Sequence, residues 1–183
     1  MLQGIAIVVL SILAAVTYGV VHDQFTARIC IEYFTIGHPP IFTVPVTSPT
    51  IVGLAWGVLA TWWVGAGLGV PLAIVARAGK RPTRDVGSLV RPMAILMLTI
   101  GALAALAGVA GYFVARSGAV FLPEPMASRI PADKHVAFLT DWFIHMASYL
   151  FGAIGGLVLI VMTWRSRAKL AASEENSPSD FEP

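Results

Sequence analysis

The chain has 183 residues, of which 57% are hydrophobic and only 12% are charged. A soluble domain normally carries about a quarter charged residues, so this composition argues against an ordinary water-soluble fold and predicts a lipid bilayer as the solvent. The formal net charge of +2 is too small to indicate nucleic-acid binding, and the single cysteine, Cys30, excludes an intrachain disulfide and a CxxC motif.

The apolar runs predict an all-α polytopic membrane protein whose membrane domain covers residues 1–170. A helix needs roughly 20 apolar residues to cross about 30 Å of hydrocarbon. Four runs meet this requirement, at residues 3–21, 50–76, 92–115 and 136–164. We therefore expect an antiparallel four-helix transmembrane bundle. The acidic and polar tail over residues 171–183 is expected to be disordered and cytoplasmic.

The first run is expected to be retained as a membrane span instead of being cleaved as a signal peptide. No basic side chain lies between Met1 and Gly4. The apolar stretch is also longer than the 7–15 residues of a typical signal-peptide core.

Small residues recur at helical spacing along every run. In a bilayer, helices associate by close packing of such residues, so these stripes indicate faces turned toward other helices. The second run carries Gly53, Gly57, Thr61, Gly65 and Gly69, and the third carries Gly101, Ala104, Gly108, Gly111 and Ala115. The fourth carries Asp141, His145, Ser148, Gly152 and Gly155, which places its two ionisable residues on a protein-facing surface.

The distribution of Lys and Arg predicts the orientation, because cytoplasmic connections of membrane proteins are enriched in these residues. Eight basic residues fall on one side: Arg77, Lys80, Arg81, Arg84, Arg91, Arg165, Arg167 and Lys169. Four fall on the other side: Arg28, Arg116, Arg129 and Lys134. This predicts that both termini are cytoplasmic and that the two longer connections face outward.

Polar side chains concentrate in the outer half, which holds all four histidines. An ionisable group deep in a bilayer costs roughly 2.5–3.5 kcal/mol on insertion scales, so such a group normally faces a protein interior and has a partner. We predict a metal or ligand site formed by His22, Glu32, His135, Asp141 and His145. Supporting roles are expected for Asp23, Arg28, His38 and Tyr149.

Imidazole and carboxylate together suit a transition metal such as zinc, iron, copper or manganese, but the residues do not identify the cofactor. A haem is disfavoured, because only His145 lies deep enough to hold the ring. Asp141 and His145, at i and i+4, are spaced to pair with each other. A base oriented by an acid is also a catalytic arrangement, so the question of enzymatic activity stays open.

Two other functional hypotheses remain. In the first hypothesis, the protein is a non-catalytic subunit or assembly partner of a membrane complex, and its polar cluster is a structural network. The second is an ion or small-solute transporter acting as a homo-oligomer. A single chain is disfavoured as a transporter, because the fourth run offers nothing ionisable between Gly152 and Met162.

The first outer connection, from His22 to Pro40, is too apolar for a free loop. Two arrangements would bury its apolar side chains: an amphipathic helix on the membrane surface, or a segment folded back as a cap over the bundle. A cap would bring Arg28 and Glu32 over His22 and Asp141.

This connection, HDQFTARICIEYFTIGHPP, and the later run HVAFLTDWFIHMASYLFGAIGG resemble an uncharacterised family of small bacterial four-span membrane proteins. The resemblance extends over most of residues 1–165. It implies a location in the bacterial cytoplasmic (inner) membrane, and it brings with it no activity and no functional residue.

Overall fold

A computed structural model describes residues 1–175, which form an all-helical bundle without strands, as predicted. The helices are α1 (Leu2–Ile29), α2 (Ile31–Thr35), α3 (Pro49–Leu59), α4 (Trp62–Arg77), α5 (Gly87–Arg116), α6 (Met126–Arg129), the short 3-10 helix η1 (Ala132–Lys134) and α7 (His135–Glu175).

Four helical segments are long and apolar enough to cross a membrane, which agrees with the four predicted spans. They are Leu2–Ile29, Pro49–Arg77, Gly87–Arg116 and Ala132–Glu174. At a rise of 1.5 Å per residue, the 28 residues of α1 extend about 42 Å, more than the hydrocarbon thickness.

The helices extend beyond the apolar runs. The polar residues that follow residue 21 continue α1 to Ile29, and α5 begins at Gly87. The helix α7 continues to Glu175, so the first residues of the tail expected to be disordered are helical. The rest of that tail, residues 176–183, lies outside the described residues.

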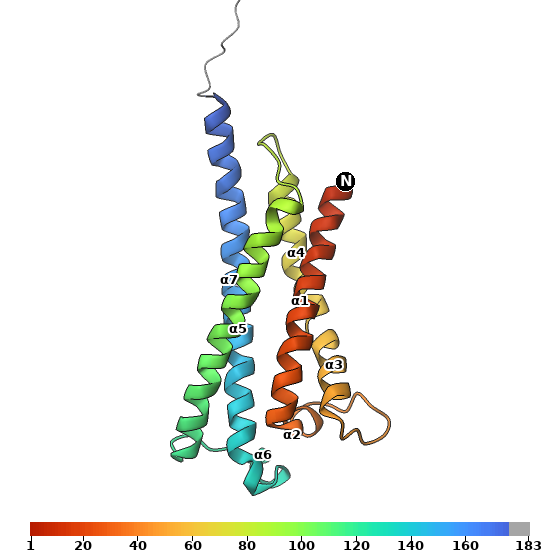
Figure 1. Cartoon of the computed structure of the whole chain (residues 1–183), viewed down its shortest axis with the longest axis vertical. Helices are drawn as coiled ribbons and strands as arrows, with labels where there is room; N and C mark the ends of the chain where they lie inside the picture. Colours follow the sequence, from red (N-terminus) through yellow and green to blue (C-terminus); the bar gives the residue numbers. More distant parts are fainter. Residues whose placement is uncertain (176–183) are drawn as a thin grey trace, which may run out of the picture.

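The bundle has two distinct ends (Figure 1). The N-terminus, the connection between α4 and α5, and the last turns of α7 lie together at one end, which we call the basic end (residues 77–91 and 164–175). The helices α2 and α6 lie at the opposite end, which we call the capped end (residues 30–48 and 117–134).

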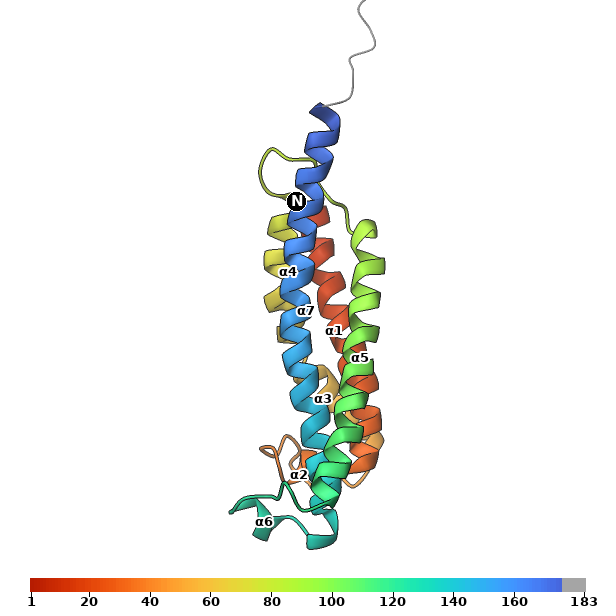
Figure 2. The ribbon, with the colours of Figure 1, turned by 90° about the vertical axis from the view of Figure 1, so that its left-hand side faces the viewer.

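Two helical hairpins make up the bundle (Figure 2). The helix α1 packs along α3 and α4, and α5 packs along α7. The two hairpins meet through α4 with α7, and through α1 with α5 and α7. Any side chain that joins α1 to α7 therefore ties the hairpins together.

Glycines in the predicted stripes allow close approach between helices. A Cβ on Gly57 would lie 2.5 Å from the Cα of Val20, so only glycine fits against α1 there. In the other hairpin, a Cβ on Gly111 would lie 2.6 Å from the side chain of Phe143. The stripes of the second and third spans thus face helices, as predicted. Gly152 of the fourth stripe differs, because a Cβ there would meet nothing within 4 Å.

The second span is interrupted between α3 and α4. The Thr61 hydroxyl donates a hydrogen bond to the Gly57 carbonyl, 2.5 Å away, and so satisfies one backbone acceptor beside the break. A Cβ on Gly19 of α1 would lie 2.4 Å from the Thr61 side chain, which shows that α1 covers the break closely.

The connection that follows α1 folds back as a cap, which decides between the two predicted arrangements. Cys30 is extended and ends α1, and α2 then packs against α1, α3 and α7. Tyr33 and Phe34 are buried beneath it. These two rings take the apolar surface of the segment out of contact with solvent and place it over the polar centre of the bundle.

Candidate metal centre

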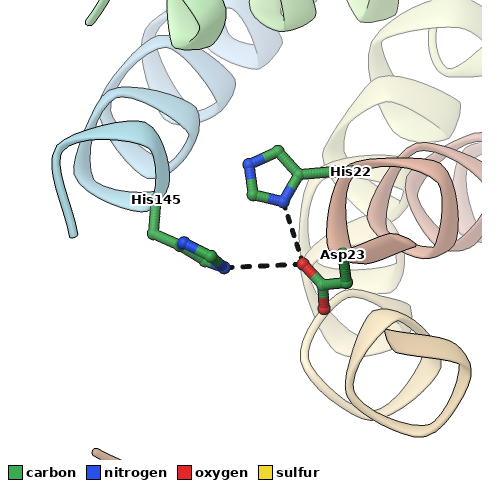
Figure 3. Close-up of side chains that lie close together, drawn as sticks. All are labelled: His22, Asp23 and His145. Carbon is green, nitrogen blue, oxygen red and sulfur yellow. Dashed lines mark hydrogen bonds and ion pairs between the residues drawn. The ribbon is translucent and has the colours of Figure 1, made fainter. Parts of the chain in front are cut away.

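Three ionisable side chains converge between the two hairpins. His22 and Asp23 come from α1, and His145 comes from α7 (Figure 3). The Asp23 Oδ1 atom lies 2.9 Å from His22 Nδ1 and 3.5 Å from His145 Nε2. All three ligand atoms lie within 4.8 Å of one another. Asp23 and His145 are buried, so this group is shielded from solvent.

The proton position on His145 is fixed by its backbone partner. His145 Nδ1 lies 2.8 Å from the carbonyl oxygen of Asp141, which only accepts hydrogen bonds. Nδ1 must therefore carry the hydrogen, and a neutral His145 presents a lone pair at Nε2. That lone pair faces a carboxylate oxygen of Asp23, and Nε2 has no hydrogen-bond partner. Two acceptors facing each other at this distance require a cation between them, either a proton or a metal ion.

A chain of hydroxyl groups holds His22. Its Nδ1 lies 2.9 Å from Asp23 Oδ1, and its Nε2 lies 3.0 Å from the Ser148 hydroxyl on α7. The Ser148 hydroxyl in turn lies 2.8 Å from the Tyr18 hydroxyl on α1. Since hydroxyl groups both donate and accept, Ser148 and Tyr18 satisfy either tautomer of His22.

Aromatic rings close the site on the side of the cap. The Tyr33 ring stacks on His145 at 4.3 Å between centroids with an interplanar angle of 27°. The Phe34 ring meets the same imidazole edge-on at 5.5 Å. Tyr149, expected to support the site, has its ring centroid 6.3 Å from that of His145. These contacts fix the plane of the imidazole and exclude water from it.

Asp141 is fully buried, and neither carboxylate oxygen has a hydrogen-bond partner. The predicted pairing of Asp141 with His145 is wrong at the level of side chains, because His145 bonds the Asp141 backbone carbonyl. The α-helical spacing brings the two residues together, but the imidazole turns back onto the preceding helical turn. The Asp141 side chain lies next to the site, within electrostatic range of Asp23 and Glu32.

The other predicted residues lie around the site and contact different partners. Glu32 accepts a long hydrogen bond from the Cys30 thiol, at 3.4 Å. His135 lies 3.0 Å from the Ile130 carbonyl and 3.1 Å from the Ala127 carbonyl, where it fixes the turn before α7. His38 bonds the Tyr33 carbonyl at 2.8 Å and packs against Trp56. Glu32 and His38 thus bond within the cap, and His135 bonds within the connection that precedes α7.

Arg28 points away from the polar centre. Its guanidinium donates to the side chain of Gln24 and to the Thr50 hydroxyl, at 2.9 and 2.8 Å. The sequence predicted that a cap would bring Arg28 over His22. The structure shows that it does not. The reason is that α1 continues past residue 22, which rotates Arg28 onto the face next to α3.

Asp23 was predicted to have only a supporting role, and Tyr18 was not among the predicted site residues. The structure makes Asp23 the residue that joins both imidazoles. Helical spacing indicates that Tyr18 and Ser148 lie near the site. Tyr18 is four residues before His22, and Ser148 is three residues after His145, so each shares a helix face with a histidine.

Burial changes the titration of two groups in the cap. It raises the pKa of the Cys30 thiol from 9.0 to about 12. Burial also raises the pKa of the Tyr33 phenol. A thiol with such a pKa stays protonated at neutral pH, which supports the role of Cys30 as a small packing residue instead of a nucleophile.

Comparisons of the chain with protein-family models, with curated proteins and with solved structures find no match. The bacterial family that the two runs resemble therefore stays a prediction. The fold and the polar cluster define the class: an all-α protein with four helices suited to span a membrane and a buried His/Asp group between its two hairpins.

Proposed function

We propose that this protein is an integral membrane protein that binds a divalent transition-metal ion through His22, Asp23 and His145. The observation that carries the proposal is the meeting of two acceptors, the His145 Nε2 lone pair and Asp23 Oδ1, at 3.5 Å. A metal ion between them would satisfy both atoms without charging the imidazole.

The spacing of the ligand atoms supports this assignment. Two ligands about 2.0–2.1 Å from a tetrahedral ion lie about 3.3–3.4 Å apart. The separations of 2.9 and 3.5 Å from Asp23 Oδ1 to the two imidazoles bracket that value, and the two imidazole nitrogens, within 4.8 Å of each other, would move closer together on binding the ion. Two imidazoles and one carboxylate match the donor set of catalytic zinc sites, which keep one position open for water or substrate.

The surroundings also resemble those of a metal site. An imidazole that ligates a metal normally donates its other N–H to a carbonyl, carboxylate or hydroxyl group. The Asp141 carbonyl serves His145 in this way, and the Ser148 hydroxyl is placed to serve His22. The unpartnered carboxylate of Asp141 would stabilise the positive charge of a bound ion.

The orientation that we propose places this site toward the outer face of a bacterial cytoplasmic membrane. The connection between α4 and α5 and the end of α7 lie together at the basic end (Figure 1). The enrichment of Lys and Arg there favours a cytoplasmic location for this end and for both termini. The capped end, with α2 closing the site, would then face outward.

A structural role of the cluster is the second candidate, and one observation favours it. The chain from Tyr18 through Ser148 to His22 joins α1 to α7, and so holds the two hairpins together. In that case the protein would serve as a subunit or assembly partner, and His145 would bear a proton where the metal is proposed.

Elemental analysis of the detergent-purified protein, followed by titration with Zn²⁺, distinguishes these functions. His145→Ala is the test variant. His135→Ala is the matched control, because His135 lies on the same helix and bonds only carbonyls. We expect one metal ion per chain in the native protein and in His135→Ala, and none in His145→Ala. Failure of the native protein to bind zinc, or equal binding by all three, would overturn the proposal.

A further inference from the structure

The basic end carries cations without acidic partners. Within residues 1–174, the ion pairs involve only histidine and Asp23, so no Lys or Arg there is paired with a carboxylate. The exposed cations at this end are Lys80, Arg81, Arg91, Arg165 and Lys169. Such a concentration of positive charge next to membrane-spanning helices attracts anionic groups.

A buried arginine gives this end a fixed shape. Arg167 on α7 is 2% exposed, and its guanidinium donates to four backbone carbonyls. The acceptors are the carbonyls of Pro82 at 2.7 Å, Ala78 at 2.8 Å and Arg81 at 2.9 Å, together with that of Val75. Arg167 thus caps the C-terminus of α4 and fixes the loop 78–82 against α7.

Two further hydrogen bonds keep the loop in place. The Arg77 guanidinium donates to the Thr83 hydroxyl at 3.0 Å, and that of Arg84 donates to Ser166 on α7 at 3.2 Å. A loop held in this way loses little conformational entropy when it binds a ligand, so its cations are already arranged for binding.

An exposed aromatic ring lies beside the loop. The Arg81 guanidinium lies 5.2 Å from the centroid of the exposed Trp164 ring. Tryptophan gathers at the level of lipid headgroups. The clamp by Arg167 holds the backbone of Arg81, whose guanidinium lies over Trp164, while Lys80 precedes Arg81 in the loop and Arg165 follows Trp164 on α7. One exposed cation therefore contacts the ring, and two more are neighbours of this pair in the chain.

We propose that Arg81, which lies over Trp164, and the chain neighbours of this pair, Lys80 and Arg165, bind the phosphate of an anionic phospholipid headgroup. The cations supply the charge, and the ring of Trp164 lies against the first acyl carbons of the same lipid. Free inorganic phosphate offers the same charge, but it lacks the apolar part that Trp164 would contact.

Native mass spectrometry of the full chain in detergent, titrated with lipid, tests this proposal. Dioleoyl phosphatidylglycerol and dioleoyl phosphatidylcholine are compared, and inorganic phosphate is added as a competitor. The test variant is Lys80→Gln with Arg81→Gln. It keeps the clamp, because Arg167 binds the carbonyl of Arg81 and not its side chain. The control is Arg116→Gln with Arg129→Gln, which removes the same charge from the capped end.

We expect the phosphatidylglycerol adduct to exceed the phosphatidylcholine adduct. We also expect about a fivefold loss of affinity for each positive charge removed from the test site, and no loss in the control. Equal binding of the two lipids, an equal loss in both variants, or displacement of phosphatidylglycerol by an equimolar amount of inorganic phosphate would overturn the proposal.

Discussion

Ser148 of α7 and His22 of α1 are joined by a hydrogen bond of 3.0 Å, although 126 residues separate them in the chain. The bond crosses from one helical hairpin to the other at the polar centre. It holds the imidazole whose other nitrogen points at Asp23. Packing and ligand geometry therefore depend on the same hydroxyl group.

Replacing Ser148 by alanine is expected to leave His22 Nε2 without its partner. The loss of a buried hydrogen bond that strands one polar group costs about 1–3 kcal/mol. Removal of a group that orients a metal ligand also weakens metal binding by about 10–100-fold. Thermal unfolding in detergent and a Zn²⁺ titration measure the two effects. Ser173→Ala, at an exposed position of the same helix, is the control and should change neither quantity.

Asp141→Asn is expected to raise the thermal midpoint of the metal-free protein. The native carboxyl group is fully buried without a hydrogen-bond partner and lies near Asp23 and Glu32, so its ionisation destabilises the fold, whereas an amide cannot ionise. The substitution keeps the backbone carbonyl that holds His145. Asp133→Asn, in exposed η1, serves as the comparison. A lower midpoint for Asp141→Asn alone would show that the carboxylate has a stabilising partner in the membrane.

Gly57→Ala is expected to destabilise the first hairpin by about 1–3 kcal/mol, because the added methyl group must push α3 away from α1. Its Cβ would lie 2.5 Å from Val20 Cα. Gly67→Ala is the matched control, since a Cβ there meets nothing within 4 Å. Its helix should be stabilised by about 0.5–1 kcal/mol. Equal midpoints for the two variants would contradict the close packing of α1 against α3.

Alkaline pH is expected to loosen the cap. Burial raises the pKa of the Cys30 thiol from 9.0 to about 12, so the folded protein holds this proton more tightly than the unfolded chain. The resulting stability is fully present below about pH 9 and is lost as the pH rises toward 12. Burial acts in the same direction on Tyr33. We expect the thermal midpoint to fall between pH 9 and 11, and to fall less steeply in Cys30→Ala. A thermal midpoint that does not change between pH 9 and 11 would contradict the burial of the Cys30 thiol and the Tyr33 phenol in the cap.

The sequence was sufficient to predict the spans, because the length of an apolar run and the thickness of the bilayer are simple quantities to compare. Periodicity also identified the face of α7 that carries Asp141, His145 and Ser148. It could not decide which side chains meet. That choice depends on the rotation of α1 against α7 and on the continuation of α1 through Asp23, which no local pattern specifies.

The position of the cap was open for a similar reason. The connection from His22 to Pro40 is too apolar for a free loop, but a membrane surface would bury its rings, including those of Tyr33 and Phe34, as well as the bundle does. Only the packing of α2 against α1, α3 and α7 places these rings on His145. The cap changed the roles of Glu32 and His38, which bond within it instead of within the polar centre.

The distance along the chain between the two halves of the polar cluster has a consequence for biosynthesis. At about 5–20 residues per second, a ribosome needs about 6–25 s to pass from His22 to Ser148. During that time α1 is already made, but Asp23 and His22 lack their partners on α7. A nascent chain halted before α7 would present these polar groups to lipid or to the insertion machinery. Completion of α7 thus supplies the partners that bury these polar groups between the two hairpins.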